Sequence, residues 1–229
     1  MHAYFKSLSD LEKIYRCPGK FKFEEHSVAE HSFKVTKIAQ FLGTVEEQEG
    51  RDINWQVLYE KALNHDYAEI FIGDIKTPVK YADPNLRQRL AEVEEKMTLH
   101  FIAEEIPERF QEVYKKRLRE AKDDSLEGQI LSVADKIDLL YESFGEIQKG
   151  NPEDLFTDIY QESLATILEF KDLVSVQYFI EEILPDLLQG EFTNQAKLQE
   201  ISDAMLRDSW WTGQLDLNLN VCSYNMVML

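Results

Sequence analysis

The chain has 229 residues, of which 44% are hydrophobic and 30% are charged, and its formal net charge is −18 at pH 7. This length suits one large domain or two small ones, with a core of useful size. The acidic balance argues against a polynucleotide ligand, because tight binding to a phosphate backbone needs a basic surface. A small anion held in a locally positive pocket remains compatible with it.

The ends of the chain and its cysteines bear on where the protein works. The sequence shows no signal-peptide pattern at its N-terminus and no apolar run of the length that spans a bilayer. Cys17 and Cys222 lie far apart and outside any CxxC spacing, which indicates neither a zinc knuckle nor a disulfide framework. We therefore expect a protein of the reducing cytoplasm.

Helical spacing of apolar residues dominates the first third of the chain. It predicts a helix around residues 5–14 that ends near Pro18-Gly19, and a second helix over residues 28–42. A third helix should run from about residue 54 to residue 69.

Helix start and stop signals mark the middle of the chain. Asp83 is typical of an N-cap, followed by Pro84 at the first helical position of a long helix. Pro107 should begin the next helix. Ser125 is the predicted cap of another, which should stop at Gly150.

Two further helices are expected over residues 155–170 and 176–188, the latter kinked at Pro185. Neither internal repeats nor low-complexity linkers are visible. We therefore predict one all-α helical bundle over residues 1–190.

Residues 191–229 are predicted to form a C-terminal extension of different character. After a short amphipathic piece come Trp210-Trp211, and then apolar and polar residues alternate over residues 215–221, which is the period of a β-strand. A single strand has no partner in a helical domain. We expect this extension to pack on the domain or on a partner subunit.

Four ligand-type residues fall at positions that the helical patterns place inward. They are two histidines and two aspartates, in the order His31, His65-Asp66, Asp135. Isolated charges in a core are costly unless they are paired or bound to a metal. Nitrogen and oxygen ligands drawn from three segments suit a first-row divalent ion better than calcium, which prefers oxygen alone.

Each of these residues also has a purely structural interpretation. His31 alone could be a hydrogen-bonded core histidine, and Asp135 alone could pair with a lysine on its own helix. A single His-Asp dipeptide is a weak signal. The combination favours a metal site, and Glu69, four residues after His65, would lie over the same helix surface.

The surrounding segments resemble a known family. The order of the four residues is that of the HD-domain metal-dependent phosphohydrolases. "VAEHSF" around His31, "NHDYAEIFIGDIKTPVKY" around the His-Asp pair and "VADKID" around Asp135 are similar to the bacterial 5'-deoxynucleotidases. The resemblance covers about Ser7 to Leu188.

This resemblance implies an all-α HD domain, a homodimer, and hydrolysis of deoxyribonucleoside 5'-monophosphates to deoxynucleoside and phosphate. It also implies a divalent ion, cobalt, manganese or a similar metal, bound by His31, His65, Asp66 and Asp135. After His65 the only further histidine is His100, so the extra imidazoles of binuclear HD phosphodiesterases are missing, which favours one ion per chain.

The resemblance also implies roles for the residues around the ion. Glu69, Asp66 and Arg16 would serve in catalysis, with Arg16 facing the phosphate. The substrate-binding set would be Arg16, Cys17, His31, Asp66, Asp74, Ile75, Lys76, Thr77 and Asp135. The family's arginine is usually followed by tryptophan, whereas Cys17 stands here, and Trp210 or Trp211 could supply a substitute ring.

Other functions remain open at this point. One is an HD phosphohydrolase acting on another nucleotide, such as a ribonucleotide, a cyclic nucleotide or a triphosphate. Another is a non-catalytic nucleotide-binding protein that kept the metal site, and a third is an all-α interaction protein whose buried polar residues satisfy one another.

Overall fold

A computed structural model describes residues 1–75, 83–118, 122–189, 192 and 194–210. Every regular element in these residues is helical, and an isolated antiparallel bridge joins Tyr15 to Ser27. The predicted all-α fold class is therefore confirmed. The strand expected over residues 215–221 lies outside the described part of the chain. None of the described helices combines the length and apolar character needed to cross a bilayer.

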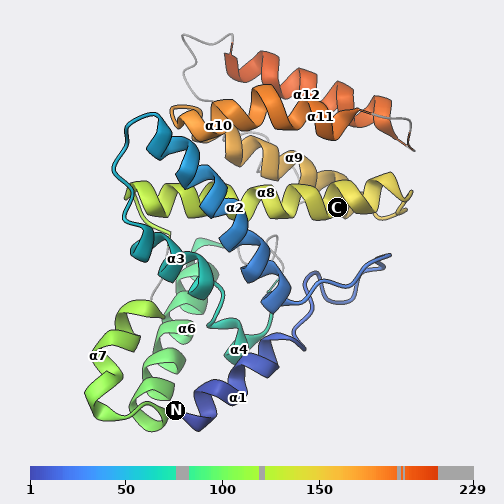
Figure 1. Ribbon diagram of the computed structural model, residues 1–229. Helices are drawn as coiled ribbons and strands as arrows, with labels where there is room; N and C mark the ends of the chain where they lie inside the picture. The colour runs from blue at the N-terminus through green and yellow to red at the C-terminus, as the bar shows by residue number, and fades with distance from the viewer. Residues whose placement is uncertain (76–82, 119–121, 190–191, 193, 211–229) are drawn as a thin grey trace.

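Helix α8 (Leu126–Gln148) runs through the middle of the molecule (Figure 1). Helix α2 (Val28–Gln48) crosses it, and α9 (Asp154–Glu169) packs along it. Helix α12 (Gln195–Trp210) lies on α9 and contacts α11 (Leu184–Leu188). The amphipathic start of the C-terminal extension is thus a full helix packed on this side of α8.

The other side of α8 carries the N-terminal and central helices (Figure 1). Helix α3 (Trp55–Asn64) packs on α2 and α8. Helix α1 (His2–Leu11), α4 (Glu69–Ile72) and α6 (Pro84–Glu105) contact one another, and α7 (Glu108–Arg117) packs on α6 and α3; these complete this half.

The predicted caps are confirmed by hydrogen bonds. Asp83 accepts the backbone N–H of Asn85 at 2.7 Å and of Leu86 at 3.1 Å, and Ser125 Oγ accepts the N–H of Gly128 at 3.1 Å. These side chains satisfy donors that a helix start leaves without partners. Local side-chain caps therefore determine where α6 and α8 begin.

Two helix ends differ from prediction. The first helix ends at Leu11 and not near Pro18. The third ends at Asn64, so the predicted continuation to Glu69 is wrong. Residues 65–68 form turns, in which Tyr67 N–H donates to Asn64 at 3.1 Å and Glu69 N–H donates to Asp66 at 3.1 Å.

The helix expected over residues 176–188 is interrupted. It consists of α10 (Val174–Tyr178), a π-helical turn η1 (Phe179–Ile183) and α11. Pro185 cannot donate a backbone hydrogen bond and its ring crowds the preceding turn, so the wider turn precedes it. The chain thus departs from α-helical geometry just before Pro185, which stands in the first turn of α11.

The core consists of two clusters of unequal size. The larger cluster is formed mainly by α2, α3, α8, α9, α10, η1 and α11, and Leu198 of α12 belongs to it. The smaller cluster consists of Leu11, Val28, Tyr67, Ile102, Ile106 and Leu118. The candidate site residues lie where these two clusters meet, because α2 contributes to both, α3 contributes to the larger one, and Tyr67 in the turn after α3 belongs to the smaller one.

Candidate functional site

His31 lies in the first turn of α2, where the N-terminal cap fixes the start of the helix. Ser27 and Glu30 form a reciprocal capping box. The His31 side chain is buried, and its Nδ1 forms a 2.7 Å hydrogen bond with Asp138 of α8. This contact directs His31 Nε2 toward the other ligand-type residues.

His65 and Asp66 leave α3 at its last turn. His65 Nδ1 forms a 2.9 Å hydrogen bond with the carbonyl oxygen of Ala62. His65 Nε2 lies 3.2 Å from His31 Nε2 and 3.2 Å from Asp66 Oδ2, and Asp66 Oδ2 lies 3.3 Å from His31 Nε2. Ligand atoms of these three residues all lie within 4.8 Å of one another.

Asp135 reaches the same place from α8 but is not part of that mutual group. Its Oδ1 lies 3.1 Å from His31 Nε2, and its Oδ2 lies 2.5 Å from Lys122 Nζ. The lysine that pairs with Asp135 precedes α8, whereas the purely structural interpretation of Asp135 expected a lysine on the same helix. The structure thus brings all four predicted ligand residues together, with Asp135 joined through His31.

Arg16 lies on the segment between α1 and α2. Its Nη1 is 3.6 Å from Asp66 Oδ2, and its Nε is 3.4 Å from Glu142 of α8. Arg16 Nε and both carboxylate oxygens of Glu142 are buried without a hydrogen bond in the described structure. The pair is held by charge alone and retains hydrogen-bonding capacity that a ligand could use.

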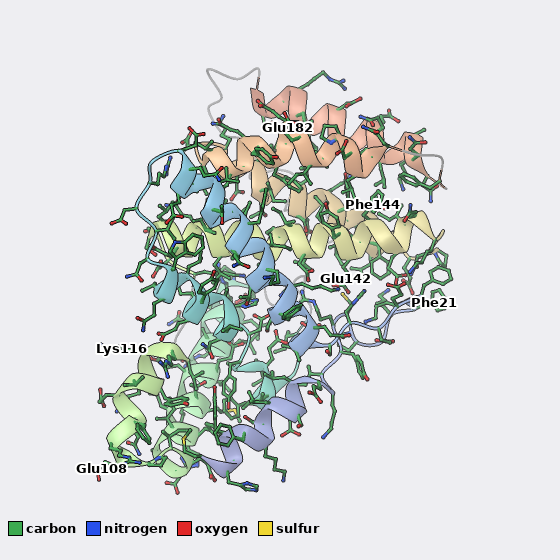
Figure 2. The ribbon with its side chains drawn as sticks, in the orientation of Figure 1. Phe21, Glu108, Lys116, Glu142, Phe144 and Glu182 are labelled. Atoms are coloured by element: carbon green, nitrogen blue, oxygen red, sulfur yellow. The ribbon has the colours of Figure 1, made fainter. Side chains whose placement is uncertain are left out.

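This connecting segment is fixed on α8 by a second buried acid. Glu146 accepts the backbone N–H groups of Phe23 and Glu24 at 3.0 Å, and the Asn151 amide at 2.6 Å. In Figure 2, Glu142 points from α8 toward this segment, whereas Phe144 points to the opposite side of the helix. One face of α8 therefore positions Arg16 next to the His/Asp cluster.

The loop after α4 joins the same segment. Asp74 Oδ2 accepts the backbone N–H of Cys17 at 2.8 Å, and Cys17 has a positive φ of 51°. Ile75 is half-buried beside Asp74, and Glu69 is buried at the first position of α4. The predicted substrate residues Lys76 and Thr77, and the ring of Trp210 and all of Trp211, lie outside what the structure describes.

The charges of the cluster shift one another's pKa values. Burial and Arg16 oppose protonation of His31, but hydrogen bonds to Asp135, Asp138 and Asp66 raise its pKa to about 10. Burial acts to raise the pKa of Asp66, yet the two histidines hold it well below its usual range. Without a metal, the acids thus hold a proton on His31.

The remaining two charged groups follow the same logic. Burial opposes the charge on Arg16, but Asp66 and Glu142 raise its pKa. Burial acts to raise the pKa of Asp135, whereas Lys122 and His31 hold it well below its usual range. Asp66 and Asp135 are therefore ionised at neutral pH, the form in which a carboxylate binds a cation.

Three residues of the site were not predicted from the sequence: Asp138, Glu142 and Lys122. Asp138 and Glu142 follow Asp135 by three and seven residues, so they share one face of α8 with it. That spacing is a signal that could have found them. Lys122 carried no such signal, because its proximity to Asp135 depends on the path of the loop before α8.

Comparison with solved structures shows to which class of protein the chain belongs. An HD-domain phosphohydrolase (lin2634) from Listeria innocua is 61% identical, with a TM-score of 0.87 over 90% of this chain and 98% of that one. A cyanophage S-2L HD phosphohydrolase (DatZ), bound to dA and one catalytic Zn²⁺ ion, shares the fold at 17% identity with a TM-score of 0.54, covering 88% of this chain and 96% of that one. The chain is an HD-domain phosphohydrolase, and its described residues hold a His/Asp cluster able to bind a metal.

The family is narrower than this class. The family model described as "5'-deoxynucleotidase YfbR-like" matches residues 3–187, and the chain belongs to that family. The 5'-deoxynucleotidase YfbR of Escherichia coli O1:K1 / APEC is 27% identical over 183 residues, which is 80% of this chain and 90% of that protein. The predicted resemblance to the HD-domain 5'-deoxynucleotidases is confirmed.

Proposed function

We propose that this protein is a metal-dependent 5'-deoxynucleotidase, which hydrolyses deoxyribonucleoside 5'-monophosphates to deoxynucleoside and phosphate. One observation carries the proposal for this chain: His31 Nε2, His65 Nε2 and Asp66 Oδ2 converge within 4.8 Å. The same activity names the family to which the chain belongs.

The residues present fit a divalent ion. The Nδ1 atoms of His31 and His65 are both engaged, by Asp138 and by the Ala62 carbonyl, which leaves the two Nε2 atoms facing one another. An acceptor on the far nitrogen is the usual support of a metal-binding histidine. We propose His31, His65, Asp66 and Asp135 as the ligands of one ion, cobalt, manganese or a similar metal.

When bound, such an ion would act as a Lewis acid on a phosphoryl oxygen and would lower the pKa of a water molecule at the site. Arg16 neutralises charge that develops on the phosphate, and its unfilled hydrogen-bonding capacity at Nε supports that role. Glu69 orients the attacking water or accepts its proton. Its burial at the first position of α4, where its backbone N–H donates to the carbonyl oxygen of Asp66, supports this role.

The sugar end of the substrate is assigned to the loop after α4. Asp74, Ile75, Lys76 and Thr77 would contact the nucleoside, with Asp74 accepting from a sugar hydroxyl. The hydrogen bond between Asp74 and Cys17 N–H supports this, because it holds the loop next to Arg16. Cys17 would line the site at the position where the family usually has tryptophan.

The test measures phosphate release from a panel of deoxy- and ribonucleoside monophosphates under a series of divalent ions. Asp66→Ala and His65→Ala should lower kcat by at least about 1,000-fold, because each removes a ligand of the ion. His100→Ala, on the exposed surface of α6, is the matched control and should keep full activity.

Circular dichroism should show an unchanged helical signal in all three variants, and metal analysis should show loss of the ion in the first two only. Full activity in Asp66→Ala would contradict the site. Pyrophosphate release from triphosphates, with no turnover of monophosphates, would contradict the proposed substrate.

The assembly and the location form further parts of the proposal. We propose a homodimer, supported by the exposed rings of Phe33 and Phe41 on α2 and Tyr178 on α10, with exposed fractions of 65%, 40% and 44%. Light scattering on the purified protein would measure its mass. We also propose a cytoplasmic location, which the free thiol of Cys17 supports and cell fractionation tests.

We propose the division into a catalytic HD domain, residues 1–190, and an extension, residues 191–229. The hydrogen bond between Tyr160 of α9 and Ser202 of α12, at 2.9 Å, supports packing of the extension on its own domain. Truncation after residue 190 should lower the melting temperature and leave the metal site intact. Loss of metal binding in the truncated chain would contradict this division.

A further inference from the structure

The loop between α7 and α8 places a lysine next to the proposed metal ligands. Lys122 Nζ lies 2.5 Å from Asp135 Oδ2, and the other oxygen of Asp135 lies 3.1 Å from His31 Nε2. The Lys122 side chain is 40% exposed, whereas the Asp135 side chain is 8% exposed. Lys122 therefore reaches Asp135 from the solvent side of the cluster.

The structure holds this part of the loop firmly. Asp123 pairs with Lys61 of α3 at 2.6 Å and accepts the backbone N–H of Ser125 at 3.1 Å. The loop also lies very close to α8, since a Cβ added at Gly128 would come within 2.4 Å of the Asp123 carbonyl oxygen. Glycine at position 128 permits this approach, and the approach fixes the position of the backbone next to Lys122.

Two cations thus flank the cluster on two different acids. Arg16 Nη1 lies 3.6 Å from Asp66, and Lys122 Nζ lies 2.5 Å from Asp135. Both acids in turn contact the same atom, His31 Nε2, at 3.3 and 3.1 Å. Any anion that binds at His31 Nε2 through an ion would meet one cation from the segment after α1 and one from the loop before α8.

The role of Lys122 changes when a metal ion binds Asp135. In the described structure its ammonium group compensates the charge of the buried carboxylate, and a bound ion would take over that task. An ammonium group on Asp135 also competes with a metal ion for the same carboxylate, so it weakens metal binding when no substrate is present. A lysine in this place is explained if it gains an anionic partner when the ion takes Asp135.

We propose that Lys122 binds the phosphate group of the substrate together with Arg16. This inference rests on the proposed function and adds a residue to its site. A phosphomonoester carries up to two negative charges, and lysine serves as a compact point charge with three donors. Lys122 would thus hold both the substrate phosphate and the inorganic phosphate that is released.

The experiment compares Lys122→Gln and Lys122→Arg with Lys136→Gln as the matched control. Lys136 is next to Asp135 on α8 and its charge acts on that aspartate, but no contact places it in the cluster. Inorganic phosphate is the probe, used as an inhibitor of the manganese-loaded enzyme and as a titrant in calorimetry. Manganese affinity is measured separately by titrating the metal-free protein.

In Lys122→Gln the inhibition constant of phosphate and the KM of a deoxyribonucleoside monophosphate should both rise at least about tenfold, since a charge-assisted hydrogen bond is lost. Manganese should bind this variant as tightly as the wild type or more tightly. Lys122→Arg should retain most of the phosphate affinity, and Lys136→Gln all of it.

An unchanged inhibition constant in Lys122→Gln would overturn the inference, as would a parallel loss of manganese affinity, which would mark Lys122 as a support of Asp135. Failure of the proposed function looks different. In that case the wild-type protein releases no phosphate from any monophosphate, and calorimetry alone then decides whether Lys122 binds phosphate.

Discussion

The two hydrophobic clusters of the molecule differ in composition as well as in size. The larger one, around α8, is built mainly from aliphatic side chains with exposed fractions near zero. The smaller one includes Tyr67 and is surrounded by aromatic contacts, such as Tyr4 with Tyr114 at a centroid distance of 5.0 Å. The candidate site lies between the two clusters, and its residues come from two kinds of segment.

His31, Asp135 and Asp138 lie on long helices packed into the larger cluster. Arg16, Asp74 and Lys122 lie on connecting segments. We propose that the dense core keeps the geometry of the ligands on these helices. The proposed substrate-binding groups are held instead by polar contacts of their segments, such as the hydrogen bond from Cys17 N–H to Asp74. This difference predicts that the two sides of the site respond to different changes.

The largest effect is expected from truncating one buried side chain in each cluster. Leu140→Ala in α8 and Ile102→Ala in α6 should each cost about 2–5 kcal/mol locally. Leu140→Ala should lower the free energy of global unfolding by that amount. Ile102→Ala should mainly speed hydrogen exchange in α1, α6 and α7, because fewer buried contacts tie these helices to the rest.

Leu63→Ala is the control, since this leucine is 55% exposed and its loss should change stability by less than about 0.5 kcal/mol. Hydrogen exchange followed by mass spectrometry measures the two halves separately. Equal acceleration of exchange in α8 and α6 for both variants would show that the molecule unfolds as one unit and would remove the proposed distinction.

The same distinction explains what the sequence could predict. Helix starts at Asp83 and Ser125 follow from side chains that cap the helix locally, so they are visible in the sequence. The end of α3 at Asn64 was missed because the inward stripe of Leu58 and Ala62 continues to His65 while the backbone turns. Local signals therefore give the helices better than they give the turns.

The candidate site shows the same limit. The inward positions of His31 and Asp135 follow from helical periodicity, and the structure buries both. Asp138 was not predicted, although it lies on the same face of α8 as Asp135. Lys122 and the link between Asp74 and Cys17 depend on how distant loops meet, and periodicity contains no information about that.

A smaller effect should follow from Asp138→Asn. The change removes the charge that holds Nδ1 of His31, so metal affinity or activity should fall by about 10- to 100-fold while the fold persists. Glu142→Gln is the contrasting variant, because Glu142 contacts Arg16 and not a histidine. It should raise KM with little change in metal affinity. Steady-state kinetics measures KM, and titration with manganese measures metal affinity.

If Asp138→Asn left metal affinity unchanged while Glu142→Gln reduced it, the division between a metal side and a substrate side would be contradicted. The comparison is clean because both residues lie on the same face of α8 and both are buried. A general loss of α8 packing would lower the melting temperature of both variants together, which a thermal scan detects.

The smallest effect concerns the thiol of Cys17, on the substrate side. Burial, and then Glu142, raise its pKa from 9.0 to about 11, so the neutral thiol dominates at pH 8. At that pH it should hold about one hundredth of the thiolate of an ordinary cysteine, and only the thiolate reacts. In a Cys222→Ser background, alkylation by iodoacetamide should be slow at pH 8 and rise about tenfold with each pH unit up to pH 10.

The alkylation rate also reports on opening of the segment that carries Arg16. If that segment opens while α8 stays folded, Cys17 reacts through a population whose thiol has its ordinary pKa, and the rate levels off above about pH 9. Ile102→Ala should then speed alkylation and Leu63→Ala should not. A rate at pH 8 equal to that of the urea-unfolded chain would show that Cys17 is not held as the structure describes. The hydrogen bond from its backbone to Asp74 would then be too weak to hold the loop after α4 next to Arg16.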